Sequence, residues 1–363
     1  MAGKKKKGGS ANGVDRLLKI SPMAEALAPK DIALPKAKAP SLVGLEVHVP
    51  APDDLIAEDL TRRFHEKVRS AGTSRDRSEK EPLAAGDDVL LNLIGYVDGK
   101  LLPFSTRFRW WTELAPMPAL PGLLEAVATA HVGDSLEVMV TLPANYPSEA
   151  FRNAPVRFAV DVLAAREVKA LDPTAKDFFK KLGLGGSMDE VMDAIRDELE
   201  EELSDELVVL GRELVLDELA HRAEVQVPAS LVDEEVRRRW SRAELPHLVE
   251  HGFNVDEQNE ARDAWLRDGA TRAECERRIK IGLALAAMLE AEKLSPTPAE
   301  LKETLEIYGE PWGLKPADVE KAATESKQAA TELGRLALYL YAVDYAVSKA
   351  KLHFEGAPLD ARV

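Results

Sequence analysis

The sequence predicts a multidomain α+β protein: a small antiparallel sheet wrapped on one short helix, followed by an extended all-α domain. Two observations carry this prediction. Between Asp88 and about Val168, several short segments alternate apolar and polar residues with a period of two, as half-buried strands do. From residue 169 nearly to the C-terminus, the apolar residues instead follow the spacing of amphipathic helices.

Changes in composition divide the chain into four expected segments. Residues 1–40 are rich in Lys, Ala, Pro and Gly, and we expect a basic, mostly disordered arm. Residues 41–85 are expected to be a linker with a strand in "SLVGLEVHVP", a helix capped by Asp53 or Asp54, and a polar connector from Thr73. Residues 86–168 form the sheet domain, and residues 169–363 form the helical domain.

The elements of the sheet domain follow in order. "VLLNLIGYVDGK" reads as a strand that ends in an Asp98-Gly99 hairpin turn. "RFRWW", "SLEVMVTLP" and "VRFAVDVLAARE" read as further strands, and "PGLLEAVATA" as the single short helix. After this domain, Asp189 to His221 predicts one long helix, the strand-like "AEVQVP" follows it, and several more helices complete the chain.

Composition and charge exclude several classes of protein. The net charge of −15 argues against a general nucleic-acid or anionic-membrane binder. The longest apolar run, Ile281 to Leu289, is too short to cross a bilayer. A single cysteine, Cys275, excludes an internal disulfide framework and fits a reducing cytoplasm. We therefore predict a cytoplasmic protein that has no membrane contact and binds no specific nucleic acid.

Few motifs point to a cofactor or a metal. "GLGG" at Gly183 to Gly186 lacks the context of a phosphate loop and reads as a helix end followed by a linker. "HLVEH", from His247 to His251, matches an inverted zinc-protease helix motif with Glu250 as its base, but it leaves a third ligand unassigned. We expect neither a cofactor nor a metal.

The order and the amino-acid sequences of these segments resemble those of trigger factor, the bacterial chaperone with an FKBP-type prolyl isomerase domain. "SLVGLEVHVPAPDDLIAEDLTRRF" is similar to the linker before that domain, and "LPGLLEAVATAHVGDSLEVMVTLPANYPSEAFRNAPVRFAVDV" to its core. "VQVPASLVDEEVRRR" and "ERRIKIGLALAAMLEAEKLSPTPAEL" are similar to the chaperone arms. The resemblance implies an FKBP-type isomerase-like domain at residues 86–168 and a chaperone domain at residues 169–363.

The resemblance also implies an apolar pocket for X-Pro bonds. It assigns the catalytic positions to Tyr146, Leu123, Phe158 and Trp110, and the substrate-binding positions to Leu93, Leu102, Phe104 and Leu120. Leu123 stands where the family places an aromatic floor, and Leu93 and Leu102 also replace rings. The pocket thus stays apolar but loses several aromatic side chains.

The expected function is that of a folding factor that binds unfolded or nascent polypeptides through helical arms and weakly isomerises X-Pro bonds. The alternative is a non-catalytic holdase or assembly scaffold with a degenerate isomerase domain. The family docks on ribosomes through an N-terminal domain, where this chain has about forty residues. Ribosome contact would then fall to Lys4–Lys7, through salt-sensitive phosphate charge.

Apolar stripes in the helical domain are the expected client surface. Leu207, Leu210, Leu214 and Leu219 lie at helical spacing, and Tyr339, Tyr341 and Tyr345 follow near the C-terminus. Most of these side chains are expected to pack against neighbouring helices, which leaves a weak and distributed remainder for clients.

Overall fold

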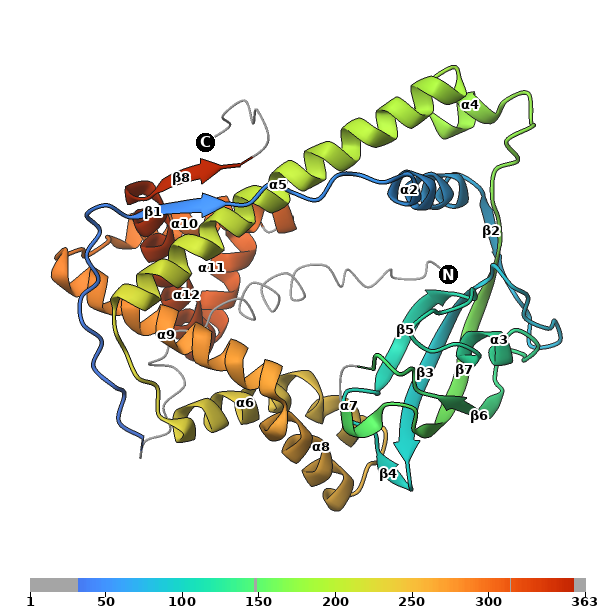
Figure 1. The fold of residues 1–363 in the computed structure, drawn as a ribbon, viewed down its shortest axis with the longest axis horizontal. Helices are drawn as coiled ribbons and strands as arrows, with labels where there is room; N and C mark the ends of the chain where they lie inside the picture. The colour runs from blue at the N-terminus through green and yellow to red at the C-terminus, as the bar shows by residue number, and fades with distance from the viewer. Residues whose placement is uncertain (1–31, 147–148, 314, 356–363) are drawn as a thin grey trace. The chain divides into compact units, whose positions relative to one another are not determined.

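A computed structural model describes residues 32–146, 149–313 and 315–355. These residues form two compact units that are discontinuous in sequence (Figure 1). The sheet unit consists of Asp53–Glu202 and Ser241–Trp265. The helical unit consists of Leu203–Trp240, the described residues up to Pro52, and those from Leu266 onward. Residues 1–31 of the predicted arm at residues 1–40, with its lysine cluster, lie outside the described residues.

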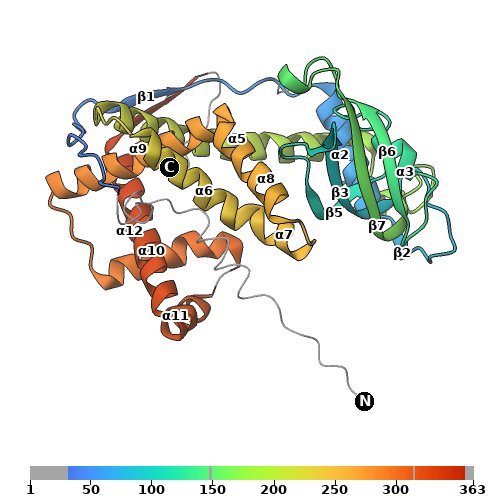
Figure 2. The same ribbon diagram turned by 90° about the horizontal axis from the view of Figure 1, so that it is seen from below.

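The sheet unit contains a six-stranded sheet in which every pairing is antiparallel. Its strands are β2 (Thr73–Asp76), β3 (Asp88–Val97), β4 (Lys100–Leu101), β5 (Arg107–Glu113), β6 (Ser135–Thr141) and β7 (Pro155–Lys169). Strands β3 and β7 pair along most of their length, β4 and β5 add to β3, and β2 and β6 add to β7. One short helix, α3 (Leu123–Val127), packs on the sheet (Figure 2). The predicted fold class is confirmed.

Alternation of side chains along the strands builds the core of this unit. Val156, Phe158, Val160 and Val162 point to one face of β7 and are nearly fully buried, as the period of two requires. Helix α3 adds Leu123, Leu124 and Val127 to the same core. The small sheet and its one helix therefore share a single apolar interior.

Three more helical segments complete the first part of this unit: α2 (Ala57–Ser70), α4 (Phe178–Leu182) and the start of α5 (Met188–Arg222). Apolar side chains of α2 and α4 pack around Ile195 on α5. Outside this cluster, Arg63 of α2 pairs with Glu198 at 2.9 Å and with Glu202 at 2.5 Å. Two elements differ from the prediction. Helix α2 begins at Ala57, after Asp53 and Asp54, and β2 is a paired strand within the expected polar connector.

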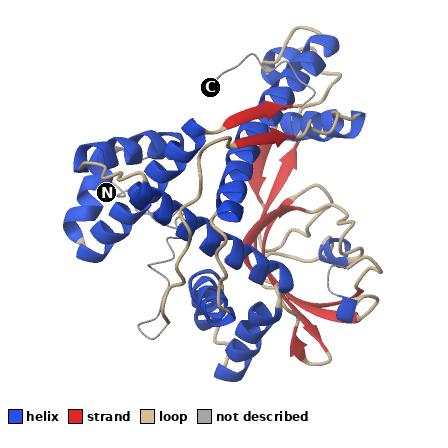
Figure 3. Cartoon of the chain, turned by 60° about the vertical axis from the view of Figure 1, so that its left-hand side comes forward, coloured by secondary structure: helices blue, strands red, loops and turns tan. Residues whose placement is uncertain are grey.

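The helical unit contains the rest of α5 and most of α6 (Ala229–Ala243), together with α9 (Gly269–Ala291), α10 (Pro298–Gly309), α11 (Pro316–Glu325) and α12 (Lys327–Lys349). A two-stranded parallel sheet joins β1 (Glu46–Val49) to β8 (Lys351–Phe354) (Figure 3). The sequence predicts β1 but not its partner. The strand predicted in "AEVQVP" is absent, because residues 223–228 form a turn and an extended connection.

Most of the predicted stripes are packed, as expected. Leu207 and Leu219 are buried, and the three tyrosines near the C-terminus are partly buried against the core of the helical unit. Leu210 is 38% exposed and follows the exposed Val208 and Val209. Within the described residues, no helix is both long enough and apolar enough to cross a membrane.

Candidate functional site

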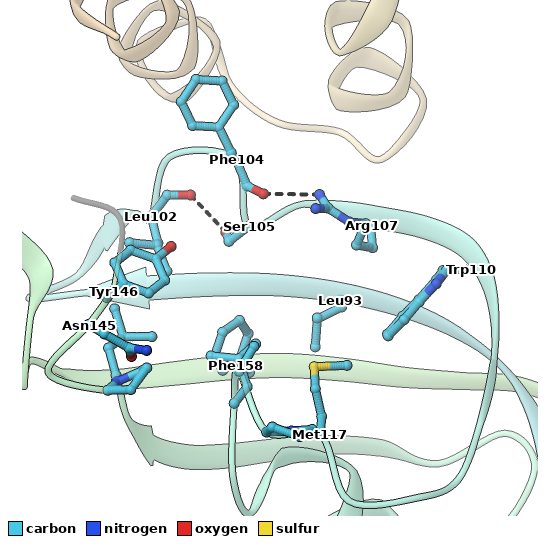
Figure 4. A pocket seen from close by; sticks show the side chains of 15 residues that line it. Leu93, Leu102, Phe104, Ser105, Arg107, Trp110, Met117, Asn145, Tyr146 and Phe158 are labelled. Carbon is cyan, nitrogen blue, oxygen red and sulfur yellow. Dashed lines mark hydrogen bonds between the residues drawn. The ribbon is translucent and has the colours of Figure 1, made fainter. Parts of the chain in front are cut away.

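A cavity of about 640 Å³ opens on the sheet unit, beside β3 and the β4–β5 connection (Figure 4). Figure 4 shows Tyr146 and Asn145 near one end and Trp110 at the other, with Phe158 and Leu93 between them. Most of its lining is apolar, and Arg107 is the one charged side chain among the described residues that line it. We call this cavity the pocket.

Seven of the eight predicted site residues line the pocket. They are Leu93, Leu102, Phe104, Trp110, Leu120, Tyr146 and Phe158. They come from β3, from the β4–β5 connection, from β5, from the loop before α3, from the loop after β6 and from β7. The structure therefore gathers side chains that the sequence spreads over 66 positions, from Leu93 to Phe158.

Leu123 is the exception. It is fully buried in the core of the sheet unit and is not part of the pocket lining. The cause is the turn before α3, in which Gly122 adopts φ +89°, a conformation that glycine takes without strain. The first residue of α3 packs into the core, and Leu120, two residues before this glycine, lines the pocket instead.

Phe104 also differs from its expected orientation. It lies at the rim, and its ring points away from Leu93 and Phe158 (Figure 4). Its backbone is left-handed, with φ +60°, which is uncommon for a bulky residue. The ring meets that of Trp265 with centroids 5.5 Å apart. The other three aromatic residues of the lining are Trp110, Tyr146 and Phe158.

Sequence reasoning missed several polar and flexible lining residues, among them Met117, Asn145, Ser105 and Arg107. The Ser105 hydroxyl donates to the carbonyl of Leu102 at 2.7 Å and accepts from the amide of Gly95 at 3.0 Å. The Arg107 guanidinium donates to the carbonyls of Phe104 and Thr106, at 3.0 and 2.8 Å. No motif marks these residues, because turn geometry rather than spacing places them.

The phenol of Tyr146 is available for hydrogen bonding. Burial raises the pKa of Tyr146, and the nearby positive charge of Arg107 opposes that rise. The group is therefore protonated at neutral pH and can donate. Among the described residues, no side chain or backbone group is hydrogen-bonded to this hydroxyl, which leaves the donor free for a bound molecule.

The "HLVEH" segment lies beside this site rather than around a metal. It forms the last four residues of α7 (Leu245–Glu250) and the C-cap residue His251, and α8 (Val255–Arg267) follows. The rings of His251 and His247 stack on Phe108, with centroids 3.9 and 5.7 Å away. In the part of the chain that the structure describes, no three His, Cys, Asp or Glu side chains gather as a metal site requires.

The single cysteine is remote from the pocket chemistry. Cys275 is fully buried in α9, and burial raises the pKa of its thiol to about 11. Since the thiolate is the reactive form, this cysteine is unreactive at neutral pH.

Comparisons with known proteins agree with the resemblance in the sequence. Residues 187–348 match the family model described as the bacterial trigger factor protein (TF) C-terminus. The trigger factor of Sphingopyxis alaskensis is 27% identical over 333 residues, which cover 88% of this chain and 58% of the relative. That of Shouchella clausii is 26% identical over 281 residues, which cover 74% and 62%. The chain thus spans about three fifths of the length of these relatives.

Two solved structures are also similar. One comes from work on promiscuous substrate recognition in folding and assembly activities of the trigger factor chaperone. It is 15% identical, with a TM-score of 0.32, and the match covers 86% of this chain and 73% of that one. The other is FkpA from Escherichia coli, 16% identical, with a TM-score of 0.20, over 32% of this chain and 60% of that one.

Proposed function

We propose that this chain, which is similar to the bacterial trigger factors, is a cytoplasmic protein-folding factor. It would bind unfolded or nascent polypeptides and isomerise X-Pro bonds in the pocket. The observation that carries the isomerase proposal is the pocket itself, an apolar cavity with a free phenol at one end. No cofactor is needed, because the reaction is a bond rotation.

The pocket suits that rotation chemically. An X-Pro amide crosses a barrier of about 18–20 kcal/mol, and it loses its charge-separated resonance when it twists. Apolar surroundings favour the less polar twisted amide over the planar one. Phe158, Leu93 and Leu120 would surround the proline ring, and the Tyr146 phenol would donate a hydrogen bond to a substrate carbonyl.

The test is a protease-free isomerisation assay on short X-Pro peptides, followed by NMR exchange. The wild-type chain should accelerate cis-to-trans exchange. Tyr146→Phe should lower kcat/KM by about five-fold, since a net hydrogen bond is worth about 1 kcal/mol. Tyr96→Phe is the matched control, because Tyr96 lies under Arg157 and outside the pocket lining. A wild-type chain without any acceleration would refute the isomerase proposal.

Arg107 leads to a prediction about substrates. Arg107 is an exposed residue at the rim, and among the described residues no carboxylate forms a salt bridge with it. A peptide with Glu before Pro should therefore be turned over about two- to five-fold faster than one with Lys, the size of an exposed ion pair. Arg107→Ala should abolish this preference, which added salt should also weaken. Arg109→Ala, outside the lining, should leave it unchanged, and equal rates for both peptides in the wild type would contradict the prediction.

The second candidate function, a non-catalytic holdase, rests on the helical unit. Val208, Val209 and Leu210 expose consecutive apolar side chains on α5, with 37, 60 and 38% of their surfaces accessible. Suppressed aggregation of an unfolded client, without peptide isomerisation, would favour this function.

Binding to ribosomes through Lys4–Lys7 is a separate proposal, and co-sedimentation at two salt concentrations tests it.

A further inference from the structure

One side of the pocket packs against a helical segment of the same unit. We call residues 102–107 the rim segment, because four of them, Leu102, Phe104, Ser105 and Arg107, line the pocket. Phe104 and Arg107 also line a second cavity of about 330 Å³, whose other side is formed by Ala243, Glu244, His247 and Trp265. The rim segment is therefore a thin partition between the pocket and the helical segment 241–265. Both lie in the sheet unit.

Glu244 is the polar centre of this contact. Its carboxylate accepts from the Thr106 hydroxyl at 2.7 Å and from the Trp265 indole at 2.8 Å, through different oxygens. Glu244 is only 8% exposed, and neither of these partners is a cation. Burial of a carboxylate costs free energy unless hydrogen bonds replace its lost hydration. The burial of Glu244 therefore depends on both of these hydrogen bonds.

Aromatic rings surround this carboxylate contact. Phe104 packs on Trp265, and Phe108 stacks on His251 and lies edge-on to Phe253. The left-handed backbone of Phe104 turns its ring toward α8 rather than into the pocket. Such a conformation persists only where the surroundings hold it, and the helical segment supplies those surroundings.

We propose that Glu244 is a positioning residue for the pocket: by binding Thr106 and Trp265 together, it holds the rim segment in the conformation that receives a proline-containing peptide. This inference rests on the proposed isomerase function for its effect on catalysis. Its structural half, the ordering of the rim segment by residues 241–265, stands independently. Loss of the contact should weaken the binding of the peptide more than it slows the rotation of the X-Pro bond. Glu244 does not line the pocket, so it acts only through the rim segment.

Two substitutions at Glu244 separate this role from simple burial. Glu244→Ala removes both acceptors and leaves the Trp265 indole without its partner. Glu244→Gln retains the contact, since its amide oxygen accepts from the indole and its amide nitrogen donates to the Thr106 hydroxyl, which also accepts. Glu260→Ala, at an exposed position on α8, is the matched control.

The first measurement is hydrogen exchange of the rim-segment amides, which needs no activity. Exchange should be about ten-fold faster in Glu244→Ala, as expected when one hydrogen bond to a charged group is lost. Glu244→Gln and Glu260→Ala should match the wild type. Unchanged exchange in Glu244→Ala would overturn the inference, and unchanged exchange throughout β3 and β7 would show that the variant remains folded.

The second measurement is the kinetics of X-Pro exchange. In Glu244→Ala, KM should rise about ten-fold with kcat nearly unchanged, and Glu244→Gln should restore it. A fall in kcat alone would overturn the positioning role. A wild-type chain without activity would refute the isomerase proposal but leave the exchange result to decide whether Glu244 orders the rim segment.

Discussion

Leu123→Ala should lower the free energy of unfolding of the sheet unit by about 2–5 kcal/mol, the range for removing a fully buried leucine side chain. Leu123 has no exposed surface and packs in the core with Leu124 and Val127. The loss of its methyl groups leaves a cavity that the tightly paired sheet cannot close. Hydrogen exchange of amides in β3 and β7 measures this effect within the unit, where global unfolding of a multidomain chain would not.

Leu120→Ala is the matched control for this prediction. Leu120 lines the pocket and is only partly buried, so the same truncation should destabilise the unit by less than about 2 kcal/mol, mainly from lost apolar burial. Its main effect should instead be a higher KM for peptides. If the two variants showed the reverse order of stability, the assignment of Leu123 to the core and Leu120 to the pocket would be wrong.

The order of the elements could be predicted from the sequence because their periods are strong. Residues 155–163 of β7 alternate clearly, and the unbroken pattern of α5 continues for 35 residues. The resemblance assigned most of the predicted site residues correctly to the pocket. Residues next to a turn keep the same position relative to the sheet when the strands on either side pair in the same register. The resemblance assigned Leu123 to the pocket. In the structure α3 begins at Leu123, directly after the Gly122 turn, and the side chain of Leu123 packs into the core.

Features that depend on pairing between distant segments could not be predicted. Thr106 and Glu244 are 138 positions apart, and neither lies in a motif. The pairing of β1 with β8 joins the two ends of the described chain, and the four residues of β8 carry no strong alternation. Strand β2 is exposed along its length, so its sequence lacks the apolar pattern that marks a strand.

Gly95 is the position where a single methyl group should change the pocket most. Gly95 lies on β3, directly opposite Phe158 on β7. A Cβ atom at this position would lie 2.8 Å from Cε1 of Phe158 and 3.0 Å from Cβ of Ser105. Phe158 is 2% exposed, and the Ser105 hydroxyl is bonded to the Gly95 amide, so both neighbours must be displaced to admit the methyl group.

Gly95→Ala should therefore destabilise the sheet unit by about 1–3 kcal/mol, as overpacking of a tight core does. It should also raise KM for X-Pro peptides, because both displaced side chains line the pocket. Amide exchange in β3 and β7 measures the first effect, and peptide kinetics the second. Gly334→Ala on α12, where a Cβ meets no atom within 4 Å, should instead stabilise its helix by up to about 1 kcal/mol. A neutral or stabilising Gly95→Ala with unaltered KM would contradict this prediction. It would mean that Phe158 and Ser105 accommodate a methyl group on β3 without any change in the pocket.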